Sequence, residues 1–433
     1  MTGTVAHRRL LFVSTNYAPE QAGTSRYATQ IAEHWAALGA EVHVLTGMPH
    51  YPAWRLDPAY AGVRTTREQR GGVTVHRRAH RVPSRQTLPR RALFELSLLR
   101  GGLAGVPEMG PPDLVAAQLP SLAAGVAGAR LAARAGVPYV PLVRNLLGVR
   151  SAAARAVERY ALRRAALVGV THETLVDGVA ALGVPRERIR LVPNWSLIPG
   201  PSRPREQMRA LLGWRPGQTV LLYAGVLTPA QRVLVEAARQ DPTLRVVLMG
   251  EGAGKEALRA LSGGLPNLDF ARTAADEEFP DVLGAADVLA VTDAAVPAEL
   301  TSYFAAGRPV VAAVAADSGT AREVDRAKAG AVVPPGDPAA LRAAVRALAA
   351  DEAVAARARD YATAHLTPTA ALTRLTALLT DALPAAPTIL PAPVAPAAAG
   401  PTPPPAAPSI PPVPEQPPAA PEPPAPVAPD AAD

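Results

Sequence analysis

The sequence contains no cysteine, which excludes disulfide bonds, thiolate metal ligands and a cysteine nucleophile. Aromatic residues make up only 4% of the 433 residues, so few side chains are available to stack on nucleic-acid bases. No apolar stretch reaches the roughly 20 residues that span a bilayer, and the N-terminal apolar run is too short for a signal peptide. We therefore expect a cytoplasmic protein that does not bind nucleic acid.

Apolar residues are plentiful, at 48% of the chain, and the length allows two or three domains of roughly 100–200 residues each. Charge is distributed unevenly along the chain. Residues 1–200 contain 25 arginines and lysines against 12 aspartates and glutamates, whereas residues 201–383 contain 19 against 21. This asymmetry predicts two surfaces with different partners, and the basic one suits an anionic membrane surface.

The last 50 residues contain 20 of the 48 prolines, mixed mainly with alanine. Such a composition cannot bury enough apolar surface to fold, so we expect residues 384–433 to form a disordered, extended Pro/Ala-rich tail. A tether, a ligand for an SH3-like domain and a passive extension are all compatible with it.

Short β-branched runs alternate with amphipathic stretches, which is typical of parallel sheets covered by helices on both faces. The first half is expected to contain a helix at 25–38 and strands at 9–14, 41–46, 113–117 and 139–143. The second is expected to contain strands at 219–224, 245–249, 267–270, 288–291, 310–314 and 331–333. The proline-containing segment 191–204 would link the halves, and helices near 337–350 and 352–380 would close the fold.

The loop after the first strand combines two chain breakers with a helix start. Pro19 and Gly23 interrupt the chain, and the helix begins near Ser25. The free backbone amides at a helix start can bind an anion, and a glycine beside them lets the anion come close. An ordinary βα loop, however, has a similar pattern.

This loop, YAPEQAGTSRY (17–27), resembles the first loop of family 4 glycosyltransferases. GMPHYP (47–52) with AYAG (59–62) resembles the colanic-acid type, and RIRLVPNW (188–195) resembles the end of the first domain. The resemblance covers about residues 8–380 and implies an α/β, GT-B fold, in which two Rossmann-like domains face each other across a cleft. The implied parts are an acceptor domain (1–195), a nucleotide-sugar donor domain (196–365), and a helix packing back on the fold (366–383).

In the first domain, the resemblance implies that Gly23 faces the donor diphosphate. It also places Arg26, His50, Tyr51 and Asn145 on the acceptor side of the cleft. Asn145 stands where relatives have an acidic residue.

In the second domain, LLYAGVLTPAQRVL (221–234) occupies the segment in which the family has a lysine that neutralises the departing diphosphate. Alanine and glutamine stand at 230 and 231, so Arg232 is the candidate catalytic cation, with a solvated surface residue as the alternative. GEGAGK (250–255) matches neither a Walker A loop nor a first Rossmann turn. The resemblance implies instead that Gly250 and Gly252, with Gly225, shape the donor nucleotide site.

The segment VPAELTSYFAAGRPVV (296–311) resembles the family's PSKL segment, whose helix start meets the donor diphosphate. Leu300, Thr301 and Ser302 are the implied donor-binding residues, and Ser302 takes the ribose-binding position. Glu299 replaces lysine at the presumed catalytic position, and a glutamate 4 Å from a phosphate costs about 1–4 kcal/mol.

The resemblance implies a retaining transferase that moves a sugar from a nucleotide-diphosphate-sugar to a lipid-linked or other glycan acceptor in cell-surface polysaccharide synthesis. We expect no cofactor and, because no DxD triplet occurs, no metal. The basic, leucine-rich stretch 77–100 suits peripheral contact with the inner face of the membrane, or a helix packed on the domain. Two alternatives remain: a non-catalytic GT-B paralogue acting as a binding or assembly scaffold, and a nucleotide-sugar 2-epimerase.

Overall fold

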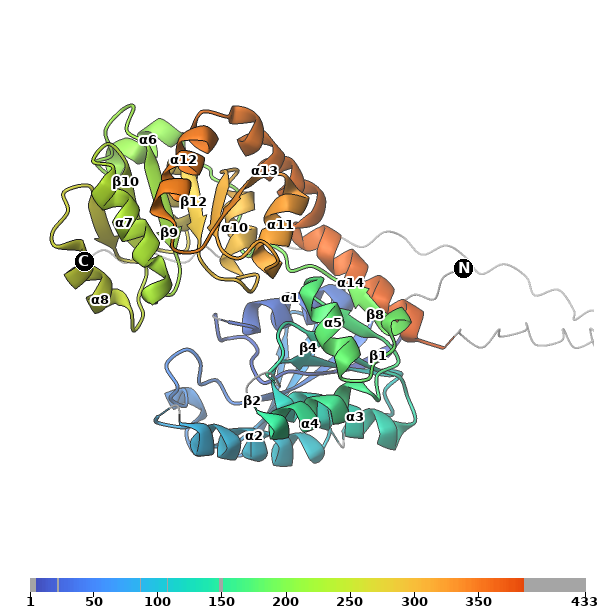
Figure 1. Cartoon of the computed structure of the whole chain (residues 1–433). Helices are drawn as coiled ribbons and strands as arrows, with labels where there is room; N and C mark the ends of the chain where they lie inside the picture. The colour runs from blue at the N-terminus through green and yellow to red at the C-terminus, as the bar shows by residue number, and fades with distance from the viewer. Residues whose placement is uncertain (1–4, 22, 86, 107, 148–150, 385–433) are drawn as a thin grey trace, which may run out of the picture. The chain divides into compact units, whose positions relative to one another are not determined.

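The computed structural model describes residues 5–384 except 22, 86, 107 and 148–150. These described residues belong to one compact unit, which contains two separate β-sheets (Figure 1). The expected tail lies outside the described residues, apart from Pro384. No helix in the described part of the chain is both long and apolar enough to cross a bilayer.

The first sheet has eight strands in the order β3-β4-β2-β1-β5-β6-β7-β8, and every neighbouring pair except β3–β4 is parallel. The strands are β1 (Arg9–Val13), β2 (Glu41–Gly47), β3 (Thr65–Arg70), β4 (Val73–Arg78), β5 (Leu114–Leu119), β6 (Tyr139–Val143), β7 (Val168–Val170) and β8 (Ile189–Leu191). The helices are α1 (Ser25–Ala37), α2 (Leu88–Leu103), α3 (Leu122–Ala135), α4 (Ala152–Leu162) and α5 (Thr174–Ala181), with 3-10 turns at Pro58–Tyr60 and Arg186–Arg188.

The second sheet has six parallel strands in the order β11-β10-β9-β12-β13-β14. They are β9 (Val220–Ala224), β10 (Arg245–Met249), β11 (Leu268–Ala271), β12 (Val288–Val291), β13 (Val310–Ala313) and β14 (Gly330–Val333). The surrounding helices are α6 (Arg205–Leu211), η4 (Pro229–Gln231), α7 (Arg232–Gln240), α8 (Lys255–Ser262), α9 (Phe279–Ala285), α10 (Glu299–Ala305), α11 (Gly319–Ala327), α12 (Pro338–Ala349) and α13 (Glu352–His365).

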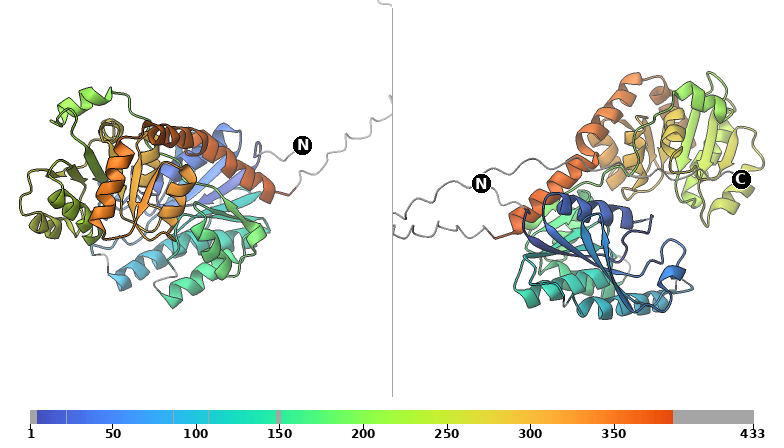
Figure 2. Two further views of the ribbon diagram at one scale, coloured as in Figure 1. Left: turned by 45° about the horizontal axis from the view of Figure 1, so that its top comes forward. Right: turned by 180° about the vertical axis from the view of Figure 1, so that it is seen from behind.

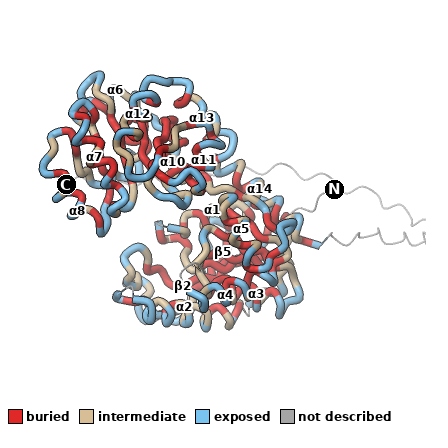
Figure 3. Tube along the Cα trace, viewed as in Figure 1, coloured by how far each residue is buried: buried red, intermediate tan, exposed pale blue. Residues whose placement is uncertain are grey.

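Each sheet is the buried middle layer between two layers of helices, as the strands in Figure 3 illustrate. One face of the first sheet packs on α1 and on the last helix, α14 (Pro368–Ala382), and the other face packs on α3, α4 and α5. The last helix therefore lies beside α1 although more than 300 residues separate them (Figure 2). The second sheet is covered by α9, α10, α11 and α13 on one face and by α7, α8 and α12 on the other.

The ten expected strands are all present, with ends shifted by at most two residues, and β8 lies in the segment 188–195 that resembles the strand and turn ending the first domain. The strands β3, β4 and β7 were not expected. The edge strand β3 has the sequence TTREQR, which lacks an apolar alternation, and β7 and β8 are three residues long. The expected helix at 352–380 is two helices, because the Thr367 hydroxyl caps a new helix at the Ala370 amide and Pro368 occupies its first turn.

The basic stretch 77–100 is also not one surface. Arg77 is the last residue but one of the inner strand β4, is fully buried and pairs with Glu68 (Nε–Oε1, 2.9 Å). Arg81 and Arg85 lie exposed in the loop that follows, and α2 presents a separate exposed face from Leu88 onward. The strand was overlooked because its terminal arginines resemble the basic residues that follow.

Both sheets have a central strand from which the chain departs in opposite directions. In the first sheet β1 lies between β2 and β5, and in the second β9 lies between β10 and β12. Loops diverge at the carboxyl end of such a strand and leave a crevice there, which is where ligands of open α/β sheets bind.

Candidate active site

A pocket of about 320 Å³ opens at the carboxyl ends of β1 and β5, at the crevice expected for the first sheet. It combines aromatic, hydroxyl, amide and charged side chains, a mixture suited to a sugar, whose ring stacks on aromatics while its hydroxyls form hydrogen bonds. The lining residues are Ser14, Thr15, Asn16, Gly23, Thr24, His50, Tyr51, Trp54, Arg91, Phe94, Glu95, Gln118, Leu119, Pro120, Ser121 and Leu147.

A buried carboxylate holds together the two loops that form this pocket. Glu20 Oε1 accepts hydrogen bonds from the backbone amides of His50 (2.7 Å) and Tyr51 (2.8 Å), and Oε2 accepts one from Asn16 Nδ2 (2.8 Å). Gly23 has a positive φ of 62°, and a Cβ there would lie 3.0 Å from the Tyr51 ring. The structure thus brings together three expected site residues, Gly23, His50 and Tyr51, whereas the role of Glu20 was not expected.

His50 is buried with a defined tautomer. Its Nδ1 lies 3.0 Å from the carbonyl oxygen of Met48, which can only accept, so Nδ1 carries the proton and Nε2 is the acceptor in the neutral ring. His80 contacts this ring, and burial, followed by the nearby His50, lowers the pKa of His80 to about 4. The His80 ring is therefore uncharged near neutral pH on this side of the pocket.

Helix α2 contributes a cation, an aromatic ring and an acid to the pocket wall. The Arg91 guanidinium lies over the Trp54 ring, 4.9 Å from its centroid, and Phe94 packs against Trp54. Glu95 Oε2 accepts hydrogen bonds from the Ser121 hydroxyl (3.1 Å) and the Ala123 amide (2.9 Å), and burial raises the pKa of Glu95. Sequence reasoning missed these residues, since a helix distant in the sequence supplies them.

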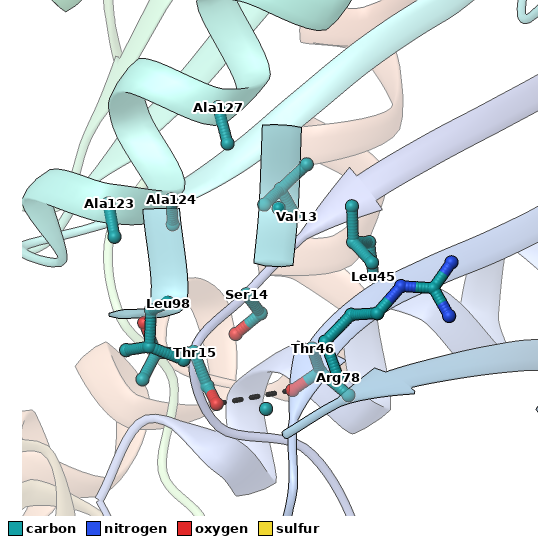
Figure 4. Close-up of a pocket in the computed structure, with 12 residues that line it drawn as sticks. Val13, Ser14, Thr15, Leu45, Thr46, Arg78, Leu98, Ala123, Ala124 and Ala127 are labelled. Atoms are coloured by element: carbon teal, nitrogen blue, oxygen red, sulfur yellow. Dashed lines mark hydrogen bonds between the residues drawn. The ribbon is translucent and has the colours of Figure 1, made fainter. Parts of the chain in front are cut away.

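The floor of the pocket contains an unsatisfied acceptor. Gln118 is only 3% exposed; its Nε2 donates to the Thr24 carbonyl (3.0 Å), while its Oε1 is buried and has no hydrogen-bond partner among the described residues. A buried acceptor is normally paired, so a ligand hydroxyl is a suitable partner for it. Figure 4 shows the smaller, mainly apolar hollow that shares Ser14 and Thr15 with this pocket; there the Thr46 hydroxyl donates to the Thr15 carbonyl (3.2 Å).

A second pocket, of about 160 Å³, lies at the carboxyl ends of β9 and β12 in the second sheet. Two of its residues are acids, Asp293 and Glu299. Burial, with a smaller contribution from Asp293, raises the pKa of Glu299, and burial raises that of Asp293. Its remaining lining residues are Tyr223, Ala224, Val226, Thr228, Ala290, Val291, Pro297 and Tyr303.

The segment expected to supply a cation to this pocket is held by hydrogen bonds. Gln231 is fully buried; its Oε1 accepts from the Thr228 amide (2.6 Å), and its Nε2 donates to the Thr292 hydroxyl (2.7 Å). Arg232 begins α7 with a side chain that is 67% exposed, and its Nε pairs with Glu236 Oε1 at 2.7 Å. Arg232 is not among the residues that line the second pocket.

The expected donor-site glycines permit a close approach of two backbone segments. Gly250 has a φ of 143°, and a Cβ there would lie 1.9 Å from the carbonyl oxygen of Gly225. A Cβ on Gly252 would lie 2.2 Å from the Leu227 oxygen. The turn after β10 is therefore packed directly on the loop after β9.

The remaining donor-site candidates lie at the start of α10, but they do not share one pocket. Glu299 lines the second pocket, whereas Leu300 and Thr301 line a small neighbouring hollow, where the Thr301 hydroxyl donates to the Ala298 carbonyl (2.7 Å). Ser302 is half-buried and lines neither hollow.

Two acceptor-side candidates lie outside the first pocket. Arg26 donates from Nη2 to the Leu197 carbonyl (2.9 Å), and its Nη1 lies 3.6 Å from Asp276 Oδ2. Asn145 is exposed, and its Oδ1 accepts from the Leu146 amide (2.9 Å). Within the described ranges, no group of three or more His, Cys, Asp or Glu residues is arranged to hold a metal ion.

Two family models match the two halves of the chain in order. A "glycosyl transferase 4-like domain" matches residues 22–195, and "glycosyl transferases group 1" matches residues 218–351. The chain is 27% identical to WcaI of Escherichia coli (strain K12), a protein named as a colanic acid biosynthesis glycosyl transferase, over 69% of this chain and 81% of WcaI.

Solved structures share the fold. HepE of Anabaena in complex with UDP is 18% identical, with a TM-score of 0.64 over 86% of this chain and 100% of HepE. Sucrose-phosphate synthase of Thermosynechococcus elongatus is 18% identical, with a TM-score of 0.65 over 86% of this chain and 98% of the synthase. The two matched domains, the resemblance to WcaI and the paired parallel sheets lead to one conclusion: this chain belongs to the family 4 glycosyltransferases and has their GT-B fold.

Proposed function

We propose that the protein transfers a sugar from a nucleotide-diphosphate-sugar to the end of a lipid-linked glycan during polysaccharide synthesis. The first-sheet pocket is the acceptor site in this proposal, and the second-sheet pocket receives the donor. The observation that carries the acceptor assignment is the unsatisfied, buried Oε1 of Gln118, in a pocket walled by Trp54 and Phe94. HepE has been solved in complex with UDP and with UDP-glucose, which supports a nucleotide-sugar donor.

In the proposed reaction the acceptor hydroxyl attacks the anomeric carbon of the donor sugar, and the bond to the diphosphate breaks. The configuration is retained, and the hydroxyl proton leaves on the departing diphosphate. The protein then contributes orientation and electrostatic stabilisation, without a covalent intermediate. Gln118 and Glu95 would orient acceptor hydroxyls, while Trp54 would pack on the sugar ring.

The direct test is calorimetric titration with UDP, GDP and their sugar conjugates, followed by product analysis with lipid-linked glycans extracted from a polysaccharide-producing strain. We expect micromolar binding of at least one nucleoside diphosphate and transfer from its sugar conjugate. Gln118→Leu should raise the KM for the acceptor about tenfold, because one buried hydrogen bond is lost, and should leave donor affinity unchanged. Absence of binding by every nucleotide would refute the transferase proposal.

We further propose that turnover needs no metal ion, on the ground that the sequence has no DxD triplet. Transfer measured after dialysis against EDTA should equal transfer in Mg²⁺ or Mn²⁺. Activity that disappears with the chelator and returns with one of these ions would contradict this proposal.

We also propose that the outer face of α2 rests on an anionic membrane surface. Leu88, Leu93 and Leu96 are 87%, 46% and 61% exposed on this helix, and Arg90 and Arg100 are exposed beside them. Apolar and basic side chains on one exposed helix are typical of interfacial binding. Because the inner face of α2 lines the first pocket, adsorption there would bring the pocket close to a lipid-linked acceptor.

Sedimentation with phosphatidylglycerol vesicles tests this contact. The wild-type protein should bind, and binding should weaken with added salt. The triple variant Leu93→Ser, Leu96→Ser, Arg90→Gln should lose most of the binding, whereas Arg322→Gln, an exposed change on α11, should not. Equal sedimentation of all three proteins would exclude this face.

A non-catalytic scaffold remains the second candidate, and a specific observation favours it. The second pocket contains Asp293 and Glu299 and no lysine or arginine among its lining residues. Such a pocket repels a diphosphate unless a residue outside its lining supplies a positive charge. Binding of a glycan without binding of any nucleotide would identify the scaffold.

A further inference from the structure

Arg144 follows directly after β6, at the same carboxyl edge of the first sheet as the acceptor pocket. Its guanidinium lies over the ring of Tyr27, 3.8 Å from the centroid, and 5.6 Å from the Trp195 centroid. Its Nη1 donates a hydrogen bond to Asn194 Oδ1. The side chain is therefore held in one place by two aromatic rings and one amide.

No acid neutralises this cation. Among the described residues, no carboxylate lies within 4.0 Å of the Arg144 guanidinium, and its Nε is buried without a hydrogen-bond partner. Burial lowers the pKa of Arg144 to about 10. An unpaired, poorly solvated charge is costly, so its presence in the fold calls for an explanation.

Two buried arginines differ from Arg144 in their partners. Arg77 is paired with Glu68 (Nε–Oε1, 2.9 Å), and Arg209 is paired with Asp287 (Nη1–Oδ2, 3.1 Å). Each of these guanidinium groups has the carboxylate that Arg144 lacks. A planar guanidinium with open N–H groups is well matched to the oxygens of a phosphate.

The surroundings of Arg144 favour an anion. Tyr27 is the third residue of α1, so the guanidinium lies beside the first turn of a 13-residue helix, whose start carries partial positive charge. Asn194, which accepts the hydrogen bond from Arg144, lines a small hollow together with Pro297, and Pro297 also lines the second pocket.

We propose that Arg144 binds a diphosphate group and supplies the positive charge that the second pocket lacks. This inference rests on the proposed transferase function and deepens it, because the cation comes from the first sheet and not from the segment around Arg232. The ligand chemistry is an alkyl or glycosyl diphosphate. It can belong to the nucleotide donor or to the lipid carrier of the acceptor.

The experiment compares Arg144→Gln and Arg144→Lys with a matched control, Arg164→Gln. Arg164 also stacks on a tyrosine, 3.7 Å from the Tyr160 centroid, but on the exposed surface. Each full-length protein is titrated with UDP, GDP, uridine, guanosine and geranyl diphosphate, and its melting temperature is recorded.

If Arg144 binds the diphosphate of the nucleotide, Arg144→Gln should weaken UDP or GDP binding at least tenfold and leave nucleoside binding unchanged. Arg144→Lys should recover part of the loss, because the charge remains but the planar fork does not. Arg164→Gln should bind like the wild type. A loss confined to geranyl diphosphate would assign the site to the lipid carrier.

A purely structural role predicts a different pattern. The melting temperature would fall, and affinity for nucleoside and nucleoside diphosphate would fall together or not at all; this result overturns the inference. If the wild type binds UDP and Arg144→Gln binds it equally well, only this inference fails. If the wild type binds none of the diphosphates, the inference and the proposed function fail together.

Discussion

A buried acid and a half-buried acid illustrate how neighbouring groups determine what a carboxylate does in this protein. Glu20 accepts hydrogen bonds from three N–H groups, so it serves as a structural anchor for two loops. Glu299 shares a pocket with Asp293, and burial raises its pKa. The same functional group therefore joins two loops at one site and, with a raised pKa, is open to titration at the other.

Donor binding should depend on the protonation of Glu299. Its pKa is raised, so its charge is lost at a higher pH than for an ordinary glutamate, and repulsion of a diphosphate disappears as the pH falls through that value. UDP affinity measured by calorimetry between pH 5 and 8 should therefore rise on acidification. Glu299→Gln should bind about fivefold more tightly than the wild type at pH 8, equivalent to about 1 kcal/mol.

The pH dependence that Glu299 causes is the difference between wild type and Glu299→Gln, because titration of UDP itself is common to both. Glu256→Gln, an exposed change on α8, is the control. Parallel pH profiles for wild type and Glu299→Gln would show that this carboxylate does not meet the diphosphate.

Glu20→Ala should destabilise the protein by about 2–4 kcal/mol, since one buried and two partly buried donors lose their acceptor. Urea unfolding measures the loss. Glu108→Gln removes an acid that pairs with Arg67 on the surface, and it should change stability by less than about 1 kcal/mol. Equal effects of both substitutions would mean that the Glu20 network contributes little.

The strand-to-helix turns are the elements that position both pockets. In the second sheet the turn after β10 contacts the backbone of the loop after β9, which is possible only because Gly250 and Gly252 have no Cβ. These glycines act on the second pocket indirectly, through the path of residues 225–228, of which Val226 and Thr228 line it. The glycine-rich turn therefore has a packing role that does not depend on contact with a nucleotide.

Gly250→Ala should therefore cost more than the ordinary penalty of a positive φ. Its Cβ would overlap the Gly225 oxygen, so we expect a loss of about 3 kcal/mol or more. Gly217→Ala is a matched control, with a φ of 72° and no atom within 4 Å of the added Cβ, and it should cost about 1 kcal/mol. Similar melting temperatures for the two variants would contradict the steric argument.

Strands that are continuous apolar runs were predictable from the sequence, whereas the buried strands β4 and β7 were not. The strands at 139–143 and 288–291 are short, continuous apolar runs, because both faces of a parallel sheet are covered. Such runs can be recognised in the sequence. The edge strand β3 has one face open to water and no apolar pattern, so only its pairing with β4 makes it a strand. An edge strand of this kind is defined by its pairing with a neighbouring strand, and a local sequence pattern carries no information about that pairing.

The last helix, α14, connects the two halves of the molecule, because it follows the second sheet in the chain and packs on the first. After the second sheet is complete, α14 packs on the first, and Leu372, Leu375 and Leu379 enter the same core as Leu10 and Trp195. The first half therefore cannot complete its apolar core until the end of the folded chain has been made. Each fully buried leucine contributes about 1.5–3 kcal/mol.

Truncation tests this dependence. A chain ending at Ala385 lacks only residues outside the compact unit and should keep the wild-type melting temperature within about 2 °C. A chain ending at Leu366 loses α14 and should be insoluble or unfold at much lower temperature, since the apolar face of the first sheet is uncovered. Normal melting of the shorter chain would show that α14 is dispensable.

The candidate site was partly foreseen. Gly23, His50 and Tyr51 lie in loops that follow strands, and the ends of parallel strands meet at one edge, so their gathering followed from the sequence. Glu95 and Gln118 belong to a helix and a strand whose approach to those loops depends on how α2 packs. No spacing in the sequence encodes that approach.

The sequence by itself determined the alternation of strands and helices, the two halves and the family, because these depend on local periodicity and on motifs that are contiguous in the chain. Only the tertiary structure decided which charges are paired. Arg77 and Arg144 are both arginines in a basic first half, yet one meets Glu68 and the other meets aromatic rings. Electrostatic energy depends on distance and desolvation in three dimensions, and neither quantity is a property of the sequence order.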